Sequence, residues 1–72
     1  MADDTVTLES IAWRGTHVEM PDDDSTVLIY MPQAAEPVWL GWHDDNGWHD
    51  VGAAPLGDSV THWAEMPKGA DV

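Results

Sequence analysis

Residues 38–51 read Val38-Trp39-Leu40-Gly41-Trp42-His43-Asp44-Asp45-Asn46-Gly47-Trp48-His49-Asp50-Val51, and they carry the strongest structural signal in the chain. Runs of apolar and aromatic residues flank Asn46-Gly47. An Asn-Gly pair in this setting is a strong hairpin signal, because both residues tolerate the positive φ of a tight hairpin turn. The segment therefore predicts two antiparallel strands, 38–43 and 47–51, with Asn46-Gly47 in the turn.

The register of this hairpin stays open from the sequence. If Asn46 and Gly47 are the two central turn residues, His43 faces Asp50 and Asp44 faces His49. If Gly47 is instead a bulge, one strand gains an extra residue and His43 faces His49. The sequence does not decide between these two registers.

Further strands are predicted on both sides of the hairpin. Residues 27–31, Val-Leu-Ile-Tyr-Met, form a β-branched and aromatic run that ends at Pro32, and residues 60–64 form another short run. Residues 7–20 fit a short helix or a short strand. The prediction is a mainly β or small α+β fold: a three- to four-stranded antiparallel meander with at most one short N-terminal helix and a tryptophan-rich core.

Five tryptophans in 72 residues argue against a disordered acidic tail. Each ring can bury roughly 150–250 Å², so together they can remove on the order of 1,000 Å² from water. We expect Trp13, Trp42, Trp48 and Trp63 in the core. Trp39 lies on the opposite strand face from Trp42, so one of these two is expected to be partly exposed as an interface anchor.

A chain of 72 residues has room for a single small domain, 1–72, and we expect flexible tails at 1–5 and 68–72. Met1-Ala2-Asp3-Asp4 lacks the basic and apolar regions of a signal peptide. No run approaches the ~20 apolar residues of a membrane span. There are no cysteines for a disulfide framework. These features predict a soluble protein of the cytoplasm.

Fourteen Asp and Glu residues against two Lys and Arg residues give a formal net charge of −12. Such a field repels nucleic acid and anionic membranes, so we expect the protein to bind neither directly. It attracts basic proteins, above all the Lys/Arg grooves that hold a phosphate backbone. The competing interpretation is a merely solvated acidic surface. The candidate partner-binding residues are Asp22, Asp23, Asp24, Glu36, Asp44, Asp45, Asp50, Asp58, Glu65 and Trp39.

The sequence offers little for catalysis or for a cofactor. His43, His49 and Asp50 could converge across the hairpin as metal ligands, but no H-E-x-x-H or Cys/His ligand spacing is present. There is also no Gly-rich phosphate loop, no serine elbow and no cysteine nucleophile. We therefore expect a protein without enzymatic activity, cofactor or metal.

Several motifs together resemble a known family. The residues that carry the resemblance are Trp13, Pro21, Val27-Leu28-Ile29-Tyr30, Gly41, Trp48, Thr61-His62-Trp63 and Met66-Pro67. Their spacing is similar to that of a family of small phage and prophage proteins known as domain of unknown function 551. The chain departs from the family pattern at Ala64-Glu65, where a typical member continues towards Pro-Leu-Pro.

The resemblance supplies no functional residues, but it implies a mobile-element origin. Small acidic proteins of such elements are often inhibitors of host defence, including anti-CRISPR and anti-restriction proteins. The expected function is an inhibitor in the bacterial cytoplasm that binds the basic nucleic-acid-binding surface of a host defence complex by acidic DNA mimicry. The alternative is a protein-interaction or assembly module that acts through an exposed aromatic patch or as a homodimer.

Overall fold

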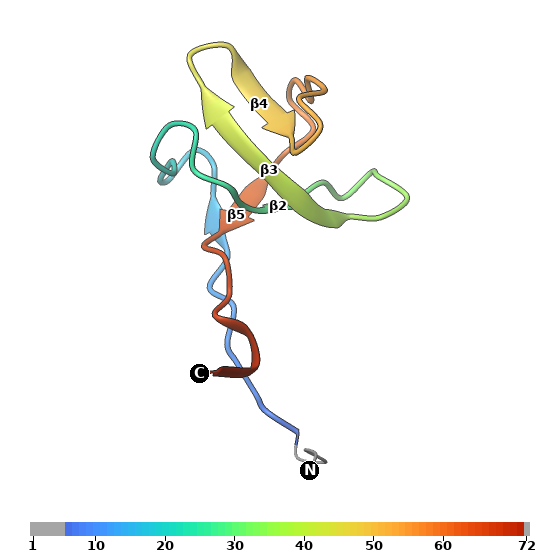
Figure 1. The fold of residues 1–72 in the computed structure, drawn as a ribbon. Helices are drawn as coiled ribbons and strands as arrows, with labels where there is room; N and C mark the ends of the chain where they lie inside the picture. Colours follow the sequence, from blue (N-terminus) through green and yellow to red (C-terminus); the bar gives the residue numbers. More distant parts are fainter. Residues whose placement is uncertain (1–5, 72) are drawn as a thin grey trace.

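The computed structural model describes residues 6–71, which form one five-stranded antiparallel sheet with strand order β1-β5-β2-β3-β4 (Figure 1). These residues contain no α-helix. The prediction of a mainly β, antiparallel fold is therefore confirmed. The elements are β1 (Arg14–Gly15), β2 (Val27–Tyr30), β3 (Val38–Asp44), β4 (Gly47–Asp50), β5 (His62–Ala64) and a 3-10 helix, η1 (Gly69–Asp71).

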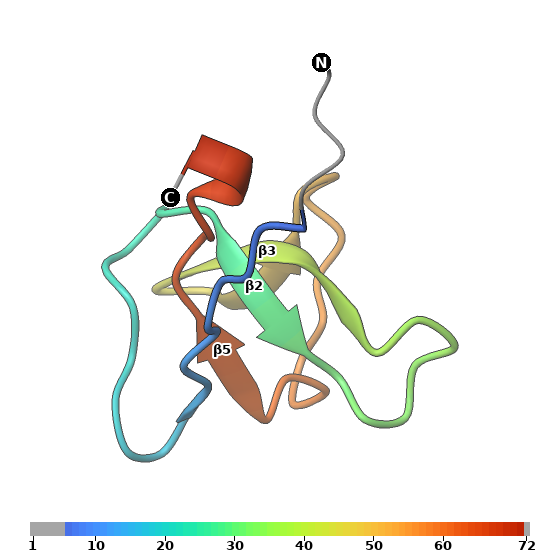
Figure 2. The same cartoon turned by 90° about the horizontal axis from the view of Figure 1, so that it is seen from below.

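The predicted meander holds for β2, β3 and β4, whereas the last predicted strand takes another place. β5 pairs with β2, placing Trp63 opposite Ile29, and the two-residue β1 adds a fifth strand beyond it. The outer side of β4 is already occupied, because the amide of Leu56 donates to the carbonyl oxygen of Trp48. β5 therefore forms its ladder at the free edge of β2 (Figure 2). The N-terminal segment forms the short strand β1 and not a helix.

The β3–β4 turn differs from both registers considered for it. The two residues between the strands are Asp45 and Asn46, and Gly47 already belongs to β4. A tight type I′ turn requires a positive φ at both of its central residues. Asp45 and Asn46 do not have positive φ, whereas Gly47 has a φ of 108°. The carboxylate Oδ1 of Asp44 accepts the amide hydrogen of Asn46 at 2.8 Å, which favours this turn over one centred on Asn46-Gly47.

The observed register sorts the aromatic residues of the hairpin onto two faces. Trp42 is opposite His49, and His43 is opposite Trp48. Because directly opposed residues share a face, Trp42 and His49 lie on one side and His43 and Trp48 on the other. The imidazole of His49 stacks on the Trp42 ring with the ring centroids 4.2 Å apart.

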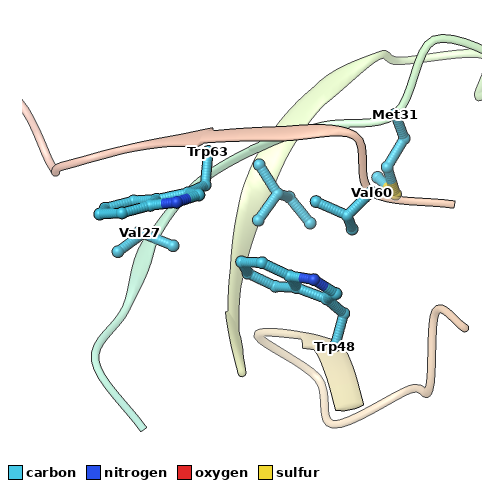
Figure 3. Close-up of a cluster of buried hydrophobic side chains, with 6 residues drawn as sticks. Val27, Met31, Trp48, Val60 and Trp63 are labelled. Carbon is cyan, nitrogen blue, oxygen red and sulfur yellow. The ribbon is translucent and has the colours of Figure 1, made fainter. Parts of the chain in front are cut away.

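The hydrophobic core lies on the face of the sheet that carries Ile29, which is completely buried. Around it pack Val27, Met31, Trp48, Val60 and Trp63 (Figure 3). The core thus contains two of the tryptophans. The expectation of a buried Trp13 is wrong, since 39% of it is exposed, and Trp42 is only half-buried. Both lie off the core face.

Gly41 of β3 is a place where the core allows no side chain. A Cβ at this position would lie 2.6 Å from the carbonyl oxygen of His49 and 2.8 Å from Cδ1 of Ile29. Carbon atoms in favourable contact are separated by about 3.5–4.0 Å. The glycine therefore lets the Ile29 side chain lie directly over the backbone of β3.

The segments before β1 and after β5 run together away from the sheet (Figure 1). The Glu9 carboxylate joins them by accepting the amide hydrogens of Lys68 at 2.7 Å and of Gly69 at 3.1 Å. The segment predicted as the C-terminal tail, 68–72, thus contains η1. Residues 1–5 and 72 lie outside the described residues. No helix in the described range 6–71 has the length and hydrophobicity to span a bilayer.

Candidate partner-binding surface

The structure brings two acidic turns together at one end of the sheet. The loop between β1 and β2 carries Asp22, Asp23 and Asp24, and the amide of Asp24 donates to the carbonyl oxygen of His43 at 2.9 Å. His43 directly precedes the Asp44-Asp45 turn, so the loop lies against the end of β3 (Figure 1). We call the five residues of this region the acidic end: Asp22, Asp23, Asp24, Asp44 and Asp45.

The acidic end has a defined backbone conformation. The amide of Ser25 donates to the carbonyl oxygen of Asp22 at 3.2 Å, which closes a turn. Asp24 has a φ of 66°, in the left-handed region that aspartate and asparagine enter more readily than most residues. The Asp44 side chain braces the second turn through its hydrogen bond to Asn46. The carboxylates are therefore carried on two short turns that are joined by a backbone hydrogen bond.

Four of the five carboxylates are free to meet a partner. Asp22, Asp23, Asp24 and Asp45 are exposed, and within residues 6–71 their side chains form no hydrogen bond or ion pair. The Asp44 side chain is 27% exposed and lies 3.9 Å from Nδ1 of His49. The acidic end thus concentrates negative charge that no cation of the described chain neutralises.

The other predicted carboxylates lie elsewhere, and two have partners in the fold. Oδ1 of Asp50 accepts the amide hydrogens of Gly52 at 2.8 Å and Ala54 at 3.0 Å, so this side chain shapes the loop after β4. Glu65 lies 4.0 Å from Nη1 of Arg14. The remaining carboxylates are exposed: Glu36 in the β2–β3 loop and Asp58 in the β4–β5 loop.

Trp39 is separated from the acidic end. It is opposite Ile29 in the sheet, 46% exposed, and five residues along β3 from Asp44, a distance of roughly 17 Å in an extended strand. Val38 beside it is also 46% exposed. The two predicted kinds of contact, charge and aromatic anchor, thus lie towards opposite ends of the same strand.

Arg14 has its own partners within the fold. Its guanidinium carbon lies 5.2 Å from the centroid of the Trp63 ring, and its Nε lies 3.3 Å from the Glu19 carboxylate. The indole N–H of Trp63 donates to the backbone oxygen of Glu19 at 2.8 Å. The cation therefore stabilises the β1–β5 side of the sheet and leaves the acidic end uncompensated.

An apolar pocket of about 290 Å³ was not expected from the sequence. It is lined by Trp13, Tyr30, Val38 and His62. Tyr30 alternates with the buried Ile29, and this alternation is the signal that places it on the other face of the sheet. No local pattern places Trp13 beside Tyr30, because β1 has only two residues.

The two histidines of the hairpin lie on opposite faces of the sheet. Nδ1 of His43 and Nδ1 of His49 are both buried without a hydrogen-bond partner. The described residues, 6–71, contain no cluster of three or more His, Cys, Asp or Glu side chains with the geometry to hold a metal ion. His43, His49 and Asp50 do not converge, because the register puts His49 on the opposite face of the sheet from His43.

Comparison with known proteins identifies a family. A family model described as "Protein of unknown function (DUF551)" matches residues 13–70, a range that includes all five strands. The chain belongs to this family. No curated protein and no solved structure matches it. Since the DUF551 description states no activity, a function for this DUF551 chain has to be argued from its own surface.

Proposed function

We propose that this DUF551 protein is a non-enzymatic inhibitor from a phage or related mobile element. It acts in the bacterial cytoplasm and binds the basic nucleic-acid-binding surface of a host defence complex, where it takes the place of DNA. The observation that carries the proposal is the convergence of the two acidic turns through the hydrogen bond from Asp24 to His43. If the acidity served only solvation, the carboxylates would not have to lie together on two turns held by hydrogen bonds.

The dimensions of the sheet support a phosphate-like array. The seven residues of β3 span about 20 Å, with Glu36 just beyond one end and Asp45 just beyond the other. One strand of duplex DNA presents a phosphate about every 3.4 Å, so this length corresponds to about six phosphates. Charges at both ends and a dense group at one end suit a groove lined by several Lys and Arg side chains.

The alternative function is a protein-interaction module that binds through aromatic residues. The exposure of neighbouring Val38 and Trp39, 46% each, favours it. The two functions differ in their response to salt, because screening weakens contacts between exposed charges and leaves an apolar interface nearly unchanged.

The proposal is tested by capture from a bacterial lysate on the immobilised protein, followed by elution with duplex DNA at constant low salt. We expect basic, nucleic-acid-binding host proteins to be released by the DNA, because both ligands compete for one surface. A matched column carrying W39A should retain the same proteins. Captured proteins that resist both DNA and 500 mM salt but are lost on the W39A column would contradict charge mimicry and support the aromatic module.

A further inference from the structure

The pocket outside the core is built around Tyr30. Tyr30 is opposite Val38 of β3 on one side and opposite His62 of β5 on the other, so the three side chains form one row across the sheet. The Trp13 ring lies 6.0 Å from the Tyr30 ring at an angle of 58°, and the His62 ring lies 5.9 Å away at 65°. Tilted rings of this kind form the walls of a cage and not a flat stack.

The cage is open to a partner. Trp13 is 39% exposed, Val38 is 46% exposed and His62 is exposed. The Nδ1 atom of His62 is 2.9 Å from the Thr61 hydroxyl oxygen, a hydrogen bond that fixes the orientation of the ring. The pocket of about 290 Å³ is thus lined by three aromatic rings and Val38, and the hydrogen bond to Thr61 holds one of these rings.

From the charge of the chain and these walls we infer that the pocket accepts a cationic side chain, Arg or Lys, of the partner protein. Aromatic faces attract cations through their quadrupole, most strongly when the cation is desolvated. The chain already shows the same contact internally, with the Arg14 guanidinium 5.2 Å above Trp63. A second copy of the chain is disfavoured as the occupant, because it would bring another −12 charges against the first.

The identification of the cation as part of a basic partner rests on the proposed function, whereas the cage itself can be tested without any partner. In the complex, the cage would add a contact that depends less on long-range charge than the acidic end does. It would also fix the orientation of the inhibitor, since a caged side chain has one position and a carboxylate array has many.

The test is a titration with tetramethylammonium chloride, followed through the indole N–H signals of the ¹⁵N-labelled protein. NaCl at equal ionic strength and tert-butanol, a neutral molecule of similar shape, are the controls. W13F and W39F assign the two indole signals by removing one each. We expect tetramethylammonium to shift the Trp13 signal with a dissociation constant in roughly the millimolar range, and neither control to do so.

Variants then test the walls of the cage. Because W13A lacks the Trp13 indole, binding to the parent and the variants is compared through the backbone amide signals of Tyr30 and His62, which line the pocket. W13A should weaken tetramethylammonium binding about 3- to 30-fold, and W39A, which removes a tryptophan of similar exposure outside the pocket, should leave it unchanged. If W13A does not fold by circular dichroism, W13F takes its place and should bind severalfold more weakly than the parent.

Equal shifts with tert-butanol, or equal effects of W13A and W39A, would overturn the cage. Cation binding together with failed capture of nucleic-acid-binding proteins would leave the cage standing and refute the proposed function.

Discussion

Replacement of Gly41 by alanine should destabilise the protein through two contacts that can be read directly from the structure. The added Cβ would lie 2.6 Å from the carbonyl oxygen of His49, where ordinary C···O contacts begin near 3.3 Å. It would also lie 2.8 Å from Cδ1 of Ile29. Ile29 is fully buried and has little space to move, and the His49 oxygen belongs to the backbone of β4. The hairpin would have to shift by about 0.7 Å to restore ordinary contact.

The magnitude follows from two opposing effects. Overpacking a core in this way costs about 1–3 kcal/mol. Alanine also restricts the unfolded chain relative to glycine, which favours folding by about 0.4–1 kcal/mol. The net loss in the free energy of unfolding for G41A should be about 1–2 kcal/mol. For a domain of this size it corresponds to a fall in Tm of roughly 4–16 °C.

The assay is thermal and urea unfolding followed by tryptophan fluorescence, with G15A as the matched control. Gly15 is also a strand glycine, but a Cβ there would meet only Cγ2 of Val18, at an ordinary 3.6 Å. Its φ is not positive, so alanine fits the backbone. G15A should be neutral or slightly stabilising. A G41A variant within about 0.5 kcal/mol of G15A would refute the packing of Ile29 over the bare backbone of β3.

Two further predictions concern charge and loop structure. Raising salt from about 10 mM to 500 mM should raise the unfolding midpoint, because the Debye length falls from ~30 Å to below ~8 Å and the −12 charges repel one another less; a midpoint that falls or stays constant would contradict this self-repulsion. D50A should lower the free energy of unfolding by about 1 kcal/mol, because the amides of Gly52 and Ala54 lose their acceptor. D58A removes an equal charge from an exposed loop position and should change stability by less than about 0.5 kcal/mol; equal effects in urea unfolding would show that Asp50 has no structural role.

The sequence was sufficient to predict the β-class of the fold and the existence of the hairpin, because strand residues and turn residues alternate clearly in 38–51. It was not sufficient to predict the register. Asn46-Gly47 favours a turn centred on itself, but the hydrogen bond from Asn46 to the Asp44 carboxylate stabilises a turn one residue earlier. Moving the turn by one residue moves the pairing by two, so the two faces keep their residues and His43 meets Trp48 and not Asp50. The bulge register, with His43 opposite His49, would have exchanged the two faces.

Contacts between segments far apart in the sequence could not be predicted from local sequence patterns either. Nothing in residues 60–64 indicates that β5 pairs with β2, since that choice depends on the loop that occupies the outer edge of β4. The acidic residues of the site could be named in advance, but only as separate clusters. That Asp22–Asp24 lie against the end of β3 depends on one backbone hydrogen bond, from Asp24 to His43. The aromatic cage was missed for the same reason: Trp13 and Tyr30 are joined only by the folded sheet.

To show that the acidic end is the partner-binding surface, variants must separate the position of the carboxylates from the net charge. Each of two triple variants replaces three carboxylates by their amides, so both have the same net charge. The acidic-end variant is D22N/D23N/D45N; it leaves Asp24 with its positive φ and Asp44 with its hydrogen bond unchanged. The scattered variant is E19Q/D58N/E65Q, whose three positions lie outside the acidic end.

The most direct measurement is the inhibition constant of each triple variant for displacing labelled duplex DNA from the captured host protein, with circular dichroism confirming the fold. Exposed ion pairs contribute about 0–1 kcal/mol each, so losing three at the binding surface should raise the constant about 5- to 30-fold. The scattered variant should raise it by less than about threefold. Equal changes in the two variants, or none in the acidic-end variant, would contradict the assignment of the binding surface to the acidic end.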